Sequence, residues 1–376
     1  MKRALILSGG GARAAYQVGV LQALADILPD DNTNPFPIIC GTSAGAINAL
    51  ALAAHPGNFK ESVNALANMW RNLKIGDVYL HGWSDILKSL SLLGLSLFNQ
   101  GIGRQRPLSL LDNSPLWDLL GSHIPFHNIN QSIASGKLLA VSVSAMGYTS
   151  GHTVSFFQGH ESIQGWNRYR RAGVATPLRL EHLIASSAIP TIFPAVRINR
   201  EYFGDGALRQ LAPISPALHL GAESLFVIGV SGNRSSTKPK RLPVKHSPSM
   251  GQIVGHLLNS AFVDSLEGDL EHMELVNNLV KLIPEENRPV DFKLRAVDNM
   301  VISPSSPLDV IAGRNVRYLP DSLRFFLRAI GATTKGGGAT AASYLLFSTE
   351  FITDLMELGY QDGLKEAEAI KNFFAK

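Results

Sequence analysis

Short apolar runs alternate with helical patterns over the first part of the chain. Residues 4–7 are apolar and are followed closely by three glycines, after which apolar residues recur at helical spacing over residues 14–28. A second apolar run at residues 37–40 leads into a turn of small residues at 41–45 and then into an alanine- and leucine-rich segment at 46–54. The pattern therefore predicts the order strand, tight loop, helix twice in succession.

Two such units in a row indicate parallel strands joined by right-handed crossovers. Further buried-strand candidates lie at residues 138–143 and 225–230, and helical patterns dominate from residue 253 to the end. We therefore predict an α/β fold. Its core is three-layered, α/β/α, with a mainly parallel central sheet, and a C-terminal helical extension follows.

The length of 376 residues fits one large catalytic domain with appended helices. The clearest change in composition is a segment rich in proline, serine and lysine. It divides the chain into three predicted parts. These are the core at residues 1–232, a basic linker-like loop at 233–249, and a mainly helical extension at 250–376 that packs on the core.

The first candidate for chemistry is the segment Gly41-Thr42-Ser43-Ala44-Gly45, which matches the pattern Gly-x-Ser-x-Gly. Small neighbours such as Gly41 and Gly45 let a serine occupy a strained turn between a strand and a helix, with its hydroxyl exposed. Taken alone, the pentapeptide is equally well explained as a plain turn. Its position between an apolar strand and an alanine-rich helix favours Ser43 as a nucleophile.

An acyl-transfer serine needs backbone N–H groups directed at the oxygen that becomes negative. Gly9, Gly10 and Gly11 are suited to this because glycine tolerates positive φ, and the following helix adds the partial positive charge of its N-terminus. The amide of Ala44, directly after the nucleophile, is the expected partner donor. The sequence thus predicts an oxyanion hole between the two turns.

The same glycine loop, read as Gly9-x-Gly11-x-x-Ala14, also fits the dinucleotide-binding fingerprint. That function requires an acidic residue about 20 positions on, at the end of the second strand. Asp30 and Asp31 precede that strand, which ends instead at Ser43. The hydrolase interpretation is therefore preferred.

Serine is a weak nucleophile until a neighbouring group takes its proton. The best candidate base is Asp205, within Gly204-Asp205-Gly206-Ala207, since flexible neighbours would present its carboxylate at a loop tip. The alternative is that the Asp-Gly pair only forms a turn and has no catalytic role. A histidine could complete a triad in this chain order. The histidines that follow Asp205 lie in helical patterns or in the polar linker, and we interpret them as surface or packing residues: His219, His246, His256 and His272.

Taken together, residues 7–13, residues 41–45 and Asp205-Gly206-Ala207 closely resemble the patatin-like phospholipase family. Residues 185–194 also look like that family, and residues 343–347 and 358–360 are similar to a bacterial branch of it. The resemblance spans nearly the whole chain. It implies a Ser-Asp dyad without histidine, assigned to Ser43 and Asp205, with Arg13 and the glycine loop forming or supporting the oxyanion hole.

The resemblance further implies hydrolysis of fatty acyl esters of phospholipids or neutral lipids through an acyl-enzyme, in the manner of a phospholipase A or lipase. It implies no metal and no organic cofactor. Two departures are small: Ala14 replaces a frequent glycine, and Ala207 stands where glycine is often found. Two alternatives stay open. One is an acyltransferase that uses the same dyad, and the other is a catalytically silent lipid- or nucleotide-binding protein of the same fold.

Charge and cysteine content indicate the binding partners and the cellular compartment that the protein suits. A formal net charge of +4 is too mild to indicate nucleic-acid binding, but it is compatible with an anionic membrane surface. The single cysteine, Cys40, excludes an intrachain disulfide and fits a reducing cytoplasm. The apolar start is too short for a signal peptide, and residues 44–54 and 86–98 are too short to span a bilayer. We expect a cytoplasmic protein with peripheral contact at the inner face of the membrane.

Two segments are candidates for that contact. Residues 83–98 are apolar with few charges and could form a lid or an interfacial helix, although an ordinary buried helix is the interpretation we prefer. The linker carries basic residues that could meet anionic headgroups, although a solvated loop is preferred there: Lys238, Lys240, Arg241 and Lys245.

Overall fold

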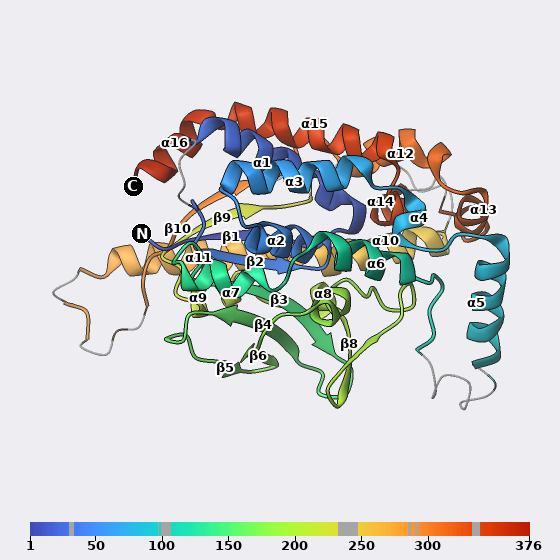
Figure 1. Ribbon diagram of the computed structural model, residues 1–376, viewed down its shortest axis with the longest axis horizontal. Helices are drawn as coiled ribbons and strands as arrows, with labels where there is room; N and C mark the ends of the chain where they lie inside the picture. The colour runs from blue at the N-terminus through green and yellow to red at the C-terminus, as the bar shows by residue number, and fades with distance from the viewer. Residues whose placement is uncertain are drawn as a thin grey trace.

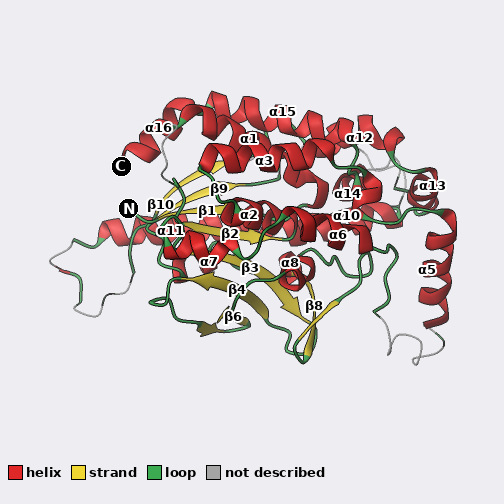
Figure 2. Cartoon of the chain, in the orientation of Figure 1, coloured by secondary structure: helices red, strands yellow, loops and turns green. Residues whose placement is uncertain are grey.

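The computed structural model describes residues 1–29, 34–96, 98, 107–231, 247–284, 287–289, 292, 294–332 and 339–376. A mixed sheet lies at the centre of the molecule, and helices cover both of its faces (Figures 1 and 2). Most of the predicted linker lies outside the described residues. The same is true of the residues singled out there and before β2: Asp30, Asp31, Lys238, Lys240, Arg241, Lys245 and His246.

Within the described part of the chain, ten strands form one sheet with the order β10-β9-β1-β2-β3-β4-β6-β5, and β8 pairs with β3 and β7. Five neighbouring strands are parallel: β10 (Asp298–Ile302), β9 (Ser224–Ile228), β1 (Arg3–Leu7), β2 (Ile38–Thr42) and β3 (Ala140–Gly147). The other strands are β4 (Thr153–Gly159), β5 (Trp166–Arg168), β6 (Arg171–Ala175), β7 (Val196–Ile198) and β8 (Glu201–Asp205). Their pairings are antiparallel except for that of β4 with β6, which is parallel.

Alternate residues of β1 face opposite layers of helices. Leu5 and Leu7 belong to a core shared with α1 (Ala15–Ile27), α2 (Ala44–Ala54), α3 (Phe59–Asn72) and α15 (Thr349–Lys365). Ala4 and Ile6 belong to a second core with α9 (Ser215–His219) and α11 (Ser265–Leu282). Burial on both faces is the reason that these strands read as continuous apolar runs. The predicted three-layer α/β/α fold is confirmed.

The C-terminal part of the chain is mainly helical, and it also supplies the edge strand β10. Its helix α15 lies along α1 on one side of the sheet (Figure 1). The other C-terminal elements are α10 (Met250–Asn259), the π-helical turn η3 (Ser260–Asp264), α12 (Leu308–Asn315), η5 (Val316–Tyr318), α13 (Asp321–Ala329), α14 (Ala339–Leu345) and α16 (Ala367–Ala375).

Shorter elements complete the layers around the strands. They are η1 (Gly11–Ala14), α4 (Ile75–Val78), α6 (Ser114–His123), α7 (Asn128–Ala134), α8 (Leu180–Ser186) and η2 (Gly206–Arg209). Across the described residues, no helix combines the length and the apolar character needed to cross a bilayer.

The prediction that residues 83–98 form a buried helix is wrong. Residues 83–96 form α5 (Trp83–Ser96), which stands at the edge of the molecule (Figure 1) and buries Ile86 alone among its residues. Trp83 is 49% exposed, Leu87 59% and Leu95 55%. The physical reason is that apolar residues occur all around this helix, so its pattern does not tell which face, if any, is covered.

Candidate active site

The glycine loop and the candidate nucleophile meet because they follow neighbouring parallel strands. β1 and β2 pair in parallel with Leu7 opposite Gly41, so both chains leave the sheet at the same edge. A Cβ atom added to Gly9 would lie 2.9 Å from the Cβ of Ser43. The pairing of the two strands therefore brings two turns, more than 30 residues apart in the chain, into direct contact.

Ser43 occupies a strained turn between β2 and α2. Its φ is +54° and its ψ is −132°, a combination that L-residues adopt at a cost of about 1–3 kcal/mol. The turn is held by the Ser43 N–H, which donates to Ser186 Oγ over 2.9 Å, while the Ser186 hydroxyl donates to the Ser144 carbonyl over 2.7 Å. The strain and its support are those expected of a nucleophile on a sharp turn. Ser43 is nevertheless only 2% exposed, so it is buried and not exposed as predicted.

The two glycines that flank the pentapeptide are required by packing. A Cβ on Gly45 would lie 2.2 Å from the carbonyl oxygen of Leu7, and one on Gly41 would lie 2.5 Å from the Cα of Ala46. Any side chain at either position would push the nucleophile turn away from β1 or from its own helix.

Asp205 is the last residue of β8, opposite Ala145 of β3, and it is fully buried. Ser43 Oγ donates to Asp205 Oδ2 over 2.5 Å, and the Ala207 N–H donates to Asp205 Oδ1 over 2.9 Å. The carboxylate thus lies at the end of an internal strand, not at a loop tip as predicted. Gly206 allows the chain to turn there, since a Cβ at this position would lie 2.2 Å from the Ser144 carbonyl oxygen.

Burial controls the proton affinity of this carboxylate. Desolvation raises the pKa of Asp205 to about 7, while the hydrogen bonds from Ser43 and from the Ala207 N–H oppose the rise. A general base works best when its pKa is near the working pH. The hydrogen bond to Ser43 and the raised pKa are the two properties that a base for this serine requires, and the role of Asp205 as that base stays a prediction.

A histidine does not take part in this contact within the described structure. The two carboxylate oxygens of Asp205 accept from Ser43 and Ala207, and His219 instead stacks on Trp166 with ring centroids 4.7 Å apart. His256 and His272 lie on α10 and α11, as their helical patterns predict. The arrangement among the described residues is a serine–aspartate pair.

The candidate oxyanion residues occupy two sides of Ser43. Gly11, with φ of +56°, and Ala44 line the same pocket as the serine, and Ala44 begins helix α2. Gly9 packs between Ser43 and Phe262, and Gly10 packs against Val230. The loop thus lies beside Ser43, and the role of each amide as an oxyanion donor stays a prediction.

The side chain of Arg13 is directed toward the C-terminal helices. Its Nε donates to Ser343 Oγ over 2.7 Å, and its guanidinium lies 4.2 Å from the centre of the Tyr344 ring. Arg13 is 4% exposed. Any contribution of this side chain to the oxyanion hole therefore passes through the conformation of the loop that carries it.

An apolar pocket begins at Ser43 and extends between α2, α3 and α6. Its free volume is about 40 Å³, room for only a few water molecules, so a longer ligand requires its side chains to move apart. The walls are almost entirely aliphatic and aromatic: Ile47, Met69, Trp70, Leu73, Val78, Leu116, Leu119, Leu120, Ile189, Phe193, Tyr344 and Phe347, with Ser187 beside them. Such a pocket suits a hydrocarbon chain joined to a group that reacts at Ser43.

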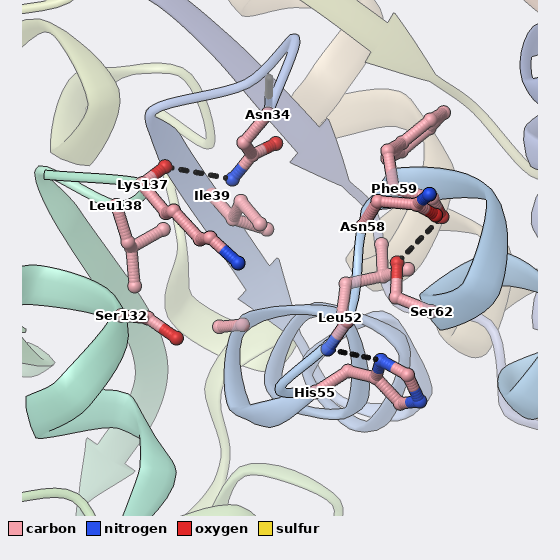
Figure 3. Close-up of a pocket in the computed structure, with 12 residues that line it drawn as sticks. Asn34, Ile39, Leu52, His55, Asn58, Phe59, Ser62, Ser132, Lys137 and Leu138 are labelled. Atoms are coloured by element: carbon pink, nitrogen blue, oxygen red, sulfur yellow. Dashed lines mark hydrogen bonds between the residues drawn. The ribbon is translucent and has the colours of Figure 1, made fainter. Parts of the chain in front are cut away.

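A second small pocket, of about 30 Å³, lies at the other end of α2 and does not include Ser43 (Figure 3). His55 and Lys137 border it, and the His55 ring accepts a hydrogen bond from the Gly57 N–H. Burial lowers the pKa of His55. In the part of the chain that the structure describes, no group of three or more His, Cys, Asp or Glu side chains could hold a metal ion.

Sequence reasoning missed the residues that support the nucleophile from a distance. Ser186 was part of a segment noted only for its resemblance, and Gln210 had no motif at all. The Thr42 hydroxyl donates to Gln210 Oε1 over 2.8 Å, and Gln210 Nε2 donates to Ser144 Oγ over 3.1 Å. These polar residues look ordinary in the sequence because their partners are far away along the chain.

Comparison with known proteins gives one family and one curated relative. The model of the family described as patatin-like phospholipase matches residues 5–218. The relative is a cGAMP-activated phospholipase from Pseudomonas aeruginosa, 30% identical over 220 residues, which are 57% of this chain and 55% of the relative. The match thus spans little more than half the length of that protein.

Two solved structures match the chain at lower sequence identity. Human GIVD cytosolic phospholipase A2, in complex with methyl gamma-linolenyl fluorophosphonate, matches with 12% identity and a TM-score of 0.44, covering 100% of this chain and 59% of that one. VipD from Legionella pneumophila matches with 13% identity and a TM-score of 0.30, covering 91% of this chain and 66% of that one.

Proposed function

The chain belongs to the patatin-like phospholipase family, and from this premise we propose that it hydrolyses acyl esters of lipids with Ser43 as nucleophile and Asp205 as base. The observation that carries the proposal is the 2.5 Å hydrogen bond from Ser43 Oγ to the buried Asp205 carboxylate. The apolar pocket that begins at the same serine supports a lipid substrate. Phospholipids are the first class to test, because the curated relative is described as a phospholipase.

In the acylation step, Asp205 takes the proton from Ser43 as Oγ attacks the ester carbonyl carbon. The carbonyl oxygen becomes negative, and the amides of Gly10, Gly11 and Ala44 are proposed to stabilise it. When the tetrahedral intermediate collapses, the ester C–O bond breaks and the leaving alcohol takes the proton from Asp205. Serine is then acylated, and the alcohol leaves.

Deacylation repeats these steps with water as the nucleophile. Asp205 takes a proton from the water as the hydroxide attacks the acyl-enzyme carbonyl, and the same amides stabilise the oxyanion. Collapse breaks the bond to Ser43 Oγ, which recovers its proton from Asp205. The products are a fatty acid and the free enzyme.

The exposed helix α5 supports a peripheral contact with a membrane. Trp83 and Phe325 of α13 pack together with ring centroids 5.6 Å apart, next to the exposed Leu87. Exposed aromatic and aliphatic side chains of this kind favour the interface of a bilayer. The exposed basic residues Lys88 and Arg328, on the same two helices, favour anionic lipids.

The experiment that tests the proposal is labelling of the purified protein by a fluorophosphonate probe, followed by peptide mapping. An adduct on Ser43 that Ser43→Ala abolishes and Asp205→Asn strongly slows is the expected result. Circular dichroism establishes that each variant is folded. An Asp205→Asn variant that reacts at the wild-type rate would exclude the dyad.

Two alternatives predict different results. A folded wild-type protein without any adduct, with added lipid and with added cGAMP, points to a silent binding protein; cGAMP is included because the curated relative is described as activated by it. If Ser43 does react, product analysis with and without an acceptor alcohol separates a hydrolase from an acyltransferase. A hydrolase releases free fatty acid in both cases.

A further inference from the structure

The glycine loop is covered by residues that lie outside the region matched by the family model, which ends at residue 218. A Cβ added to Gly9 would lie 2.8 Å from the ring of Phe262, which sits in the π-helical turn η3. A Cβ on Gly11 would lie 2.2 Å from the Tyr344 carbonyl oxygen. The loop is therefore closed on its outer side by α14 and by the turn after α10.

Arg13 ties the loop to these helices through neutral partners. Its Nε donates to Ser343 Oγ over 2.7 Å, and its terminal nitrogens donate more weakly to Asn259 Oδ1 and Tyr344 Oη, both at 3.3 Å, and to the Thr340 carbonyl oxygen at 3.5 Å. Among the described side chains, no carboxylate lies within ion-pair distance of this guanidinium. Burial lowers the pKa of Arg13, and Asp309 opposes this lowering by a smaller amount from beyond contact distance. A buried charge without a counter-ion in contact depends on these neutral contacts keeping their geometry.

Tyr344 contacts the loop in three ways. Its ring lies 4.2 Å from the Arg13 guanidinium carbon, its hydroxyl accepts from Arg13 and donates to Asn259 Oδ1 over 2.8 Å, and its carbonyl faces Gly11. The same ring forms part of the pocket that begins at Ser43. One residue thus touches the side chain, the backbone and the pocket at the point where the predicted oxyanion donors lie.

We infer that Tyr344 is a positioning residue, which holds the glycine loop through Arg13 so that the loop amides point at the developing oxyanion. The inference rests on the proposed function. Misplaced oxyanion donors weaken the transition state more than they weaken substrate binding. Loss of the Tyr344 hydroxyl therefore lowers kcat and leaves KM nearly unchanged.

The test is Tyr344→Phe, which keeps the ring against Arg13 and in the pocket wall but removes the hydroxyl. With a short water-soluble ester, we expect kcat to fall about 10- to 100-fold and KM to change less than about threefold, in line with the effect of disturbing oxyanion donors. Ser343→Ala removes a different Arg13 contact and should give a smaller fall in the same direction. This milder variant keeps the inference testable if Tyr344→Phe does not fold.

The matched control is Tyr360→Phe. The Tyr360 hydroxyl donates to Asp26 on the outside of α15, so its loss should leave kcat unchanged. Hydrogen–deuterium exchange of residues 8–14 gives a second readout that does not depend on activity: exchange should speed up in Tyr344→Phe and Ser343→Ala, but not in Tyr360→Phe.

The outcomes separate this inference from the proposed function. A folded Tyr344→Phe with wild-type kcat overturns the inference, whatever its exchange behaviour. A wild-type protein without esterase activity overturns the proposed function, and the catalytic role given to Tyr344 with it. The exchange of residues 8–14 then decides separately whether the hydroxyl holds the loop.

Discussion

Gly19 of α1 lies directly against Met356 of α15: a Cβ added to Gly19 would be 1.9 Å from the Met356 carbonyl oxygen. The contact is reciprocal, because a Cβ on Gly359 would be 2.1 Å from the carbonyl oxygen of Tyr16. Glycine at these positions allows the two helix backbones to touch. The C-terminal helix α15 is thereby fixed to the helix that follows the glycine loop.

We predict that Gly19→Ala destabilises the protein by about 3 kcal/mol or more, because α1 and α15 must move apart and the loss exceeds the roughly 1 kcal/mol that alanine gains in a helix. Thermal and urea unfolding measure the change. The control is Gly268→Ala on α11, where a Cβ would meet no atom within 4 Å. This control should be neutral or slightly stabilising; an equal loss in both variants would contradict the close-packing explanation.

The raised pKa of Asp205 predicts that the rate of acylation at Ser43 rises with pH around neutrality. The carboxylate must be deprotonated to accept the Ser43 proton, so acylation should be slow well below pH 7 and should level off above it, with an apparent pKa of about 7. The rate of fluorophosphonate labelling at Ser43, followed across this range, gives that value. In Asp205→Asn the residual labelling rate should no longer rise with pH through this range. A wild-type profile that is flat through neutral pH would exclude Asp205 as the titrating base.

The same shift makes a separate prediction about stability. Because the folded-state pKa of Asp205 lies above its ordinary value of 3.8, the folded protein binds the proton more tightly than the unfolded chain does. The protonated Asp205 therefore stabilises the fold at acid pH, and this stabilisation is lost as the pH rises through about 4 to 7. The free energy of unfolding falls by roughly 4 kcal/mol at most over this range. Asp205→Asn should therefore be at least as stable as the wild type at neutral pH, which urea unfolding at two pH values checks. A large loss of stability in the variant would show that the ionised carboxylate stabilises the fold.

Local, contiguous signals are the reason that the parallel core and the nucleophile turn could be predicted from the sequence. β1 and β2 are short runs buried on both faces, and each is followed at once by its glycine-rich turn. Asp205 was harder, since it lies 162 residues from Ser43 and its tripeptide is an ordinary turn sequence. Only the joint order of the motifs connected the two residues.

Features that depend on distant partners were not predictable. The Ser43 N–H bonds to Ser186 across 143 residues, and Arg13 bonds to Ser343 across 330 residues. The exposure of α5 was also wrongly predicted, because the sequence of an apolar helix does not tell whether the helix is covered by other parts of the protein or exposed. In each case the missing information is which surfaces meet, and this is set by tertiary packing.

The pocket next to Ser43 predicts control of acyl-chain length. Leu116 and Leu120 are buried on α6 and form part of its wall. Leu116→Phe should narrow the pocket and lower kcat/KM for a palmitoyl ester about tenfold or more relative to a butyryl ester, since the longer chain loses its apolar burial. Leu364→Phe, on the outer side of α15, should leave the ratio unchanged. If both esters lose activity equally in Leu116→Phe, the acyl chain does not bind there.

The last prediction concerns the exposed face of α5 and its neighbour α13. Replacing Leu87 and Leu95 together by serine removes two exposed apolar side chains, and each buried leucine is worth about 1.5–3 kcal/mol at an apolar interface. The double variant should lose most of its binding to anionic lipid vesicles in a flotation assay, and most of its activity on vesicle substrate. Its activity on a soluble ester should be retained.

The matched control is the double serine variant of Leu275 and Leu279, which are exposed on α11 at a helical spacing of four. It removes the same kind of side chain from a helix on the other side of the sheet, so vesicle binding should persist. Equal losses in both double variants would mean that vesicles bind through general surface hydrophobicity. Unchanged binding in the α5 variant would assign membrane contact to another surface and leave the exposure of α5 without that function.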